Sequence, residues 1–86
     1  MDSDLYDVKK VLKTLEEKGV DHIYQMVKGR KIYARAISCY DQLMNDLISS
    51  SHVRNYSVGQ NRNLFEAEVR SLCHHYISLL EEHGGK

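Results

Sequence analysis

The chain is 86 residues long, with 42% hydrophobic and 28% charged residues. A chain of this length makes one small domain, and this balance is typical of a globular protein rather than a disordered one. Twelve Lys and Arg residues balance twelve Asp and Glu residues, so no overall field attracts a polyanion. We therefore predict a single helical domain over 1–86.

Apolar runs of two or three residues are too short to cross a bilayer. The first residues, from Met1 to Asp4, are acidic and lack the apolar stretch of a secretory signal. Cys39 and Cys73 form no CxxC pair, which favours two free thiols over the alternative of one disulfide between them. We therefore expect an intracellular protein, cytoplasmic or nuclear, that does not act on a membrane.

The absence of proline favours continuous helices, and the chain begins with one. Apolar residues spaced by three or four from Leu5 to Leu15 predict a first helix over about 4–18, closed by Gly19. The same spacing resumes at Ile23 and continues to Leu47, which predicts a long second helix over about 21–50. Because the link between them is so short, we expect these two helices to be antiparallel neighbours.

Residues 52–62 lack a helical period and are rich in Asn, Ser and Gly, so they are predicted as a loop. Asn63 followed by Glu66 has the spacing of a capping box, which predicts a third helix over about 63–83. The sequence thus predicts an all-α fold, a hairpin with a long second helix plus a C-terminal helix. A break at Gly29 is the alternative, with helices over 21–28 and 31–50, and it would give four helices.

The second half of the predicted long helix extends past the end of the first helix. Its apolar face would then have only one neighbour within the chain, and an exposed apolar patch commonly marks an interface. A compact four-helix monomer, formed by a break at Gly29, is the alternative. The prediction is a homodimer in which both copies use Ile37, Tyr40, Leu43, Met44, Leu47 and Ile48.

Basic residues gather in the middle of the chain, where no acid occurs between Asp21 and Asp41. On a continuous helix, Lys28, Lys31 and Arg35 would project from the face opposite the apolar face. An ordinary solvated face is the alternative, because the net charge is zero. We predict an external partner-binding surface that combines these cations with loop residues: Lys28, Lys31, Arg35, Arg54, Tyr56 and Arg62.

Motifs for catalysis and metal binding are not evident. The sequence holds no Gly-x-Ser-x-Gly elbow and no phosphate-binding glycine loop, so we assign no catalytic residue. Cys73, His74 and His75 are adjacent, and neighbouring helix residues point about 100° apart, so they do not converge on one ion. No metal, cofactor or small-molecule substrate is expected.

Arg70 and His75 form an Arg-x4-His spacing on the last predicted helix. This spacing resembles the pair that HEPN-type ribonucleases carry on a helix, where two copies meet across a dimer to cleave RNA. Ser71 departs from the polar amide or acid usual in that family, and the chain is short for its fold. The resemblance covers six residues and implies RNA cleavage by Arg70 and His75.

The sequence most favours a non-catalytic interaction protein, an adaptor, regulator or complex subunit that binds another macromolecule and acts as a homodimer. A nucleic-acid-binding dimer, which would use the same cations against phosphates, is the first alternative. The HEPN-like ribonuclease is the second alternative. These hypotheses differ in the partner, which is another protein, a nucleic acid bound through its phosphates, or a scissile RNA strand.

Overall fold

The structure is a computed structural model that describes residues 2–32, 34–56 and 60–84. These residues form helices and no strand, so the all-α fold class is confirmed. In chain order the helices are α1 (Asp2–Lys18), α2 (Val20–Val27), α3 (Cys39–Ile48), α4 (Ser51–Arg54) and α5 (Gln60–Gly84).

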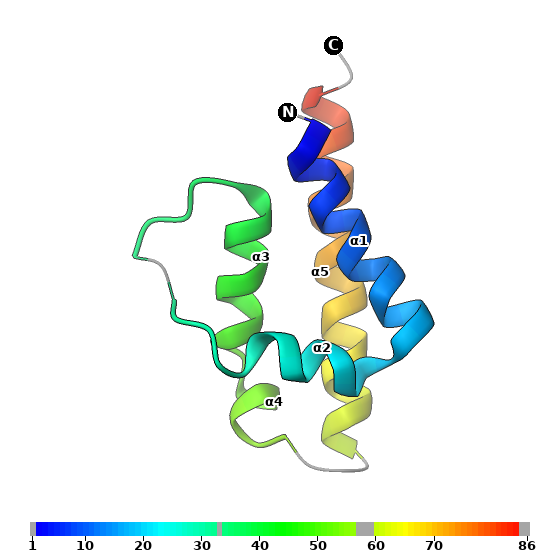
Figure 1. Ribbon diagram of the computed structural model, residues 1–86, viewed down its shortest axis with the longest axis vertical. Helices are drawn as coiled ribbons and strands as arrows, with labels where there is room; N and C mark the ends of the chain where they lie inside the picture. The colour runs from blue at the N-terminus through cyan, green and yellow to red at the C-terminus, as the bar shows by residue number, and fades with distance from the viewer. Residues whose placement is uncertain (1, 33, 57–59, 85–86) are drawn as a thin grey trace.

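The two longest helices, α1 and α5, lie antiparallel and side by side, and both described ends of the chain lie at one end of the molecule (Figure 1). Helix α3 packs against both of them, and α2 crosses the other end of the pair (Figure 1). The molecule measures 42 × 28 × 16 Å along its principal axes. Four helices thus enclose one core, and the short α4 packs against α5.

The buried core draws apolar side chains from α1, α2, α3 and α5, which explains why each of them shows helical periodicity. Phe65 is its largest side chain and has no exposed surface. Polar residues are nearly absent from the core, where Asn45 and Ser50 are the buried polar side chains among the described residues. The apolar members are Val8, Val11, Leu15, Val20, Ile23, Val27, Leu43, Met44, Leu47, Phe65, Val69 and Cys73.

Gly19 makes the corner between α1 and α2. Its φ is 91°, a conformation that favours glycine, and its N–H donates to the Leu15 carbonyl at 3.0 Å. The predicted end of the first helix is therefore confirmed. The antiparallel pairing of the first two helices is not observed, because α2 turns across the molecule and buries Val20, Ile23 and Val27 in the core.

The prediction of one continuous helix over 21–50 is wrong. Helix α2 ends at Val27 beside Gly29, as the alternative of a break proposed, but α3 begins only at Cys39 rather than at residue 31. Ser38 caps α3 by accepting the Asp41 N–H. The Asp4 carboxylate, from α1, also accepts the N–H groups of Cys39 and of the residue after it, each at 3.0 Å.

Burial explains why the chain breaks here. A straight helix over these residues would be roughly 45 Å long, whereas the whole molecule measures 42 Å in its longest dimension. The break lets α2 and α3 approach the α1–α5 pair from different directions, so that apolar side chains of both are buried. Each fully buried side chain contributes about 1.5–3 kcal/mol, which together outweighs the lost helical hydrogen bonds.

The predicted loop over 52–62 is partly helical. Ser50 accepts the His52 N–H and donates to Glu68, and this cap starts α4 at Ser51, so that the helix extends into the predicted loop. Helix α5 begins at Gln60, so Asn63 lies inside the helix instead of capping it. Residues 57–59 of the predicted loop lie outside the described residues. Helix α5 otherwise runs as predicted, to Gly84 against the predicted 83.

Candidate functional site

The six residues predicted for self-association are mostly used inside the single chain. Leu43, Met44 and Leu47 are at most 1% exposed and belong to the core. Tyr40 and Ile48 are half-buried and pack against this core. Only Ile37 stands out, with 87% of its surface exposed. The apolar face that suggested a homodimer is thus covered by α1 and α5, because the break after Val27 lets α3 fold against them.

Two of the predicted partner-binding residues instead hold the fold together around Asp21. The Tyr56 hydroxyl donates to the Asp21 carboxylate, and Arg62 binds the same carboxylate at 2.8 and 3.1 Å. The Tyr56 hydrogen bond, followed by Arg62, holds the pKa of Asp21 below its ordinary range. Tyr56 also packs its ring edge against Phe65. This cluster ties the start of α2 to the start of α5.

Lys28 and Arg54 also have partners within the chain. The Tyr24 and Tyr56 rings stack at 3.9 Å, and the Lys28 ammonium lies 5.7 Å from the Tyr24 ring centroid. Arg54 donates to the Ser49 carbonyl at 2.9 Å. The predicted set therefore divides, because Arg54 stays on α4 while Lys28, directly after the end of α2, contacts Tyr24 of that helix.

The remaining two predicted cations lie in the chain between α2 and α3, which we call the basic segment and define as the described residues among 28–37. Lys31 and Arg35 are exposed and make no ion pair or hydrogen bond with the described part of the chain. Two apolar residues accompany them, Ile32 at 54% exposure and Ile37 at 87%. The segment projects from the side of the helical body (Figure 1).

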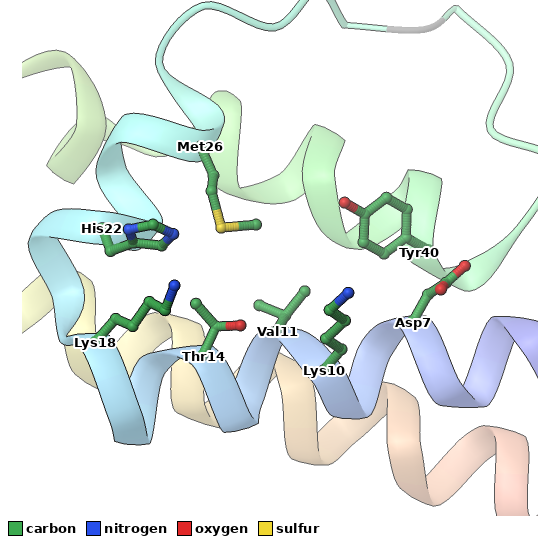
Figure 2. Close-up of a pocket in the computed structure, with 8 residues that line it drawn as sticks. All are labelled: Asp7, Lys10, Val11, Thr14, Lys18, His22, Met26 and Tyr40. Carbon is green, nitrogen blue, oxygen red and sulfur yellow. The ribbon is translucent and has the colours of Figure 1, made fainter.

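A cleft of about 430 Å³ opens between α1 on one side and α2 and α3 on the other. Figure 2 shows side chains of α1 extending across the opening toward His22, Met26 and Tyr40. We call this cleft the basic cleft, and its lining residues are Asp7, Lys10, Val11, Thr14, Lys18, His22, Met26 and Tyr40.

The basic cleft combines two lysines on its α1 wall with an apolar floor. Lys10, Lys18 and His22 are exposed and make no hydrogen bond or ion pair within the described residues. Val11, at 2% exposure, and the half-buried Met26 supply the apolar surface between them. Such a mixture of an apolar floor with a few polar groups is typical of ligand sites.

The basic segment borders the basic cleft through one aromatic residue. The Arg30 guanidinium lies 5.9 Å from the centroid of the Tyr40 ring, and Tyr40 lines the cleft. At this distance a cation is attracted to the ring face. Arg30 of the basic segment therefore lies next to the Tyr40 end of the basic cleft.

Sequence reasoning missed the basic cleft, although one signal was present. Lys10, Thr14 and Lys18 recur at every fourth position and therefore share a face of α1. The sequence alone did not reveal that the glycine corner brings His22 and Met26 over this face.

Arg70 and His75, the pair that resembles HEPN-type ribonucleases, have different surroundings on α5. Arg70 forms ion pairs with Glu16 and Glu66, and it lines a shallow hollow on α5 that includes His74 and excludes His75. The hydrogen bond from Arg70 to Glu16, followed by that to Glu66, raises the pKa of the guanidinium.

The described residues contain free thiols but no metal-binding cluster and no helix that could span a membrane. Cys39 and Cys73 are both free thiols, as predicted. Within the described ranges, no three His, Cys, Asp or Glu side chains are grouped so that they could bind a metal ion. None of the helices that the structure describes combines the length and apolarity that crossing a bilayer requires.

Comparison with known proteins found no matching family model, no matching curated protein and no matching solved structure. The function is therefore inferred from the residues of this chain.

Proposed function

We propose that the protein is a non-catalytic interaction module that binds an acidic segment of a partner protein through the basic segment. The single observation behind this proposal is the composition and exposure of that segment. It carries Lys28, Arg30, Lys31 and Arg35 without any acid, and its two isoleucines are exposed.

The exposed isoleucines support a protein partner. Interface cores are depleted in charge and need apolar surface, which a partner with apolar residues between its acids would cover. Ile32 and Ile37 are more than half exposed, unlike the apolar side chains that are buried in the core. Lys31 and Arg35 would add electrostatic steering and specificity at the rim of this contact.

Nucleic acid is less well supported by this geometry. The nucleic-acid hypothesis placed the cations on one long helix, and that helix is broken. Arg62, which was to add a phosphate contact from the loop, is paired with Asp21 instead. The cations of the basic segment therefore do not follow one helix face along a duplex groove.

A selection of peptides from a random displayed library tests the proposal, because the partner does not have to be identified beforehand. The immobilised wild-type chain is the bait, and the double variant Lys31→Glu with Arg35→Glu is the comparison. Lys9→Glu with Lys13→Glu on α1 changes the net charge equally; both of these lysines are exposed, and the variant also breaks the ion pair between Lys9 and Glu81. Circular dichroism verifies that every variant is folded.

The expected result is enrichment of peptides that carry Asp or Glu next to apolar residues. Their affinity should fall by about tenfold or more in the basic-segment variant and by less than about twofold in the α1 variant. Ile37→Ser should weaken the same peptides. Equal losses in both double variants would contradict the proposal, because only general charge would then matter. Tighter binding of a short RNA duplex, with a steep salt dependence, would favour the nucleic-acid alternative instead.

A further inference from the structure

We infer that the basic cleft is a binding site for a small organic anion, a phosphate monoester or a carboxylate attached to an apolar body. This site is separate from the partner surface proposed above, and its first support is its shape. The volume of about 430 Å³ falls within the range of ligand pockets, roughly 300–1,000 Å³.

One end of the basic cleft is suited to the anionic group. Lys18 from α1 and His22 from α2 lie at this end, and Thr14 lies one turn before Lys18, with its hydroxyl directed toward the middle of the cleft (Figure 2). Lys18 contributes a full positive charge, and the hydroxyl and imidazole contribute hydrogen-bond donors. Neither Lys18 nor His22 is paired with another described residue, so a ligand would not need to displace an internal ion pair.

The middle of the cleft is suited to an apolar body. Val11 forms a buried floor, and Met26 faces it across the opening with a flexible thioether that adapts to ligand shape (Figure 2). An inorganic anion would leave this apolar surface exposed to water. The floor therefore selects ligands in which the anion is attached to a ring or an aliphatic group.

The opposite end holds groups that limit the charge of the ligand. The Asp7 carboxylate lies there near Lys10 and Tyr40, so this end, unlike the Lys18 end, presents an acid to the ligand (Figure 2). A second anionic group would meet the Asp7 carboxylate and be disfavoured. We therefore assign one anionic group, at the Lys18 end, and a neutral far end that hydrogen-bonds to Asp7 or Tyr40.

An NMR titration of the ¹⁵N-labelled full chain tests this site with defined probes. Phenyl phosphate and phenylacetate each join an anion to a ring, whereas inorganic phosphate has no apolar body. Lys18→Gln and His22→Ala alter the anionic end. Lys13→Gln is the matched control, because this exposed lysine of α1 does not line the cleft. The dispersed amide spectrum of each variant shows that it is folded.

Saturable shifts at residues 10–18 and 22–26 with one of the two ring anions are expected, and the tighter of the two identifies the anion class. Lys18→Gln should raise Kd by about tenfold and Lys13→Gln by less than about twofold. Lys31→Glu with Arg35→Glu should leave Kd unchanged, which separates this site from the partner surface. The inference is overturned by shifts that do not saturate, by equal effects of the two lysine variants, or by inorganic phosphate binding as tightly as phenyl phosphate.

Discussion

Leu47→Ala separates the two roles that the sequence and the structure give to one residue. The sequence placed Leu47 in a homodimer interface, whereas the structure buries it completely in the core of one chain. A core residue stabilises the fold at every protein concentration. An interface residue stabilises it only where the dimer forms, so its effect varies with concentration.

The expected cost follows from burial. The substitution removes three carbon groups, worth about 0.8 kcal/mol each in transfer free energy, and it leaves a cavity that adds to the loss. A decrease of about 3–5 kcal/mol in the free energy of unfolding is therefore expected. An 86-residue chain has a total free energy of unfolding of roughly 4–13 kcal/mol. The variant would therefore lose a large part of its stability, and at the lower end of this range it would unfold.

Urea unfolding, followed by far-UV circular dichroism over about a hundredfold range of protein concentration, measures this change. The midpoint should shift equally at all concentrations. Ile37→Ala is the control, because its side chain is 87% exposed, and it should change stability by less than about 0.5 kcal/mol. If Leu47→Ala lowered the free energy of unfolding only slightly, and if the urea midpoint depended on protein concentration, burial within one chain would be refuted. The result would support the homodimer interface instead.

Three further measurements test local contacts. Asp4→Ala removes the acceptor of two N–H groups at the start of α3, and urea unfolding should show a loss of about 1–2 kcal/mol. Tyr56→Phe removes the main cause of the lowered pKa of Asp21. The stability difference from wild type should be full above pH 3.8, the ordinary pKa of that carboxyl, and should shrink as the pH falls below it in thermal unfolding experiments. Burial raises the pKa of Cys73 to about 12, so in a Cys39→Ser background a thiol reagent should label Cys73 only as fast as the chain unfolds.

The first and last helices were predictable because local signals determine them. Helix α1 has a continuous apolar stripe and a glycine corner at its end, and α5 is amphipathic over most of its length. The break between α2 and α3 was harder to predict, because apolar spacing persists through it. Ile37 continues the three-and-four pattern of a helix and yet is 87% exposed in the basic segment.

The start of α3 shows why local sequence was insufficient there. Ser38 is a favoured N-cap residue and was a local signal for this start. The stronger contact comes from Asp4, which lies 35 residues away from Cys39 in the chain. Such a contact depends on the packing of α1 against α3, which no pattern within either segment encodes.

The zero net charge of the chain conceals a positive surface, because many of its acids are engaged by the fold. Carboxylates bind arginines, cap a helix or accept hydrogen bonds from hydroxyl groups, whereas Lys10, Lys18, Lys31 and Arg35 have no ion-pair partner among the described residues. A balance counted from composition ignores position, whereas a partner meets the charges of one surface at a time. Zero net charge therefore disfavours an anionic ligand for the chain as a whole, but not for the basic segment or the basic cleft. The engaged carboxylates are those of Asp4, Glu16, Asp21, Asp46, Glu66, Glu68 and Glu81.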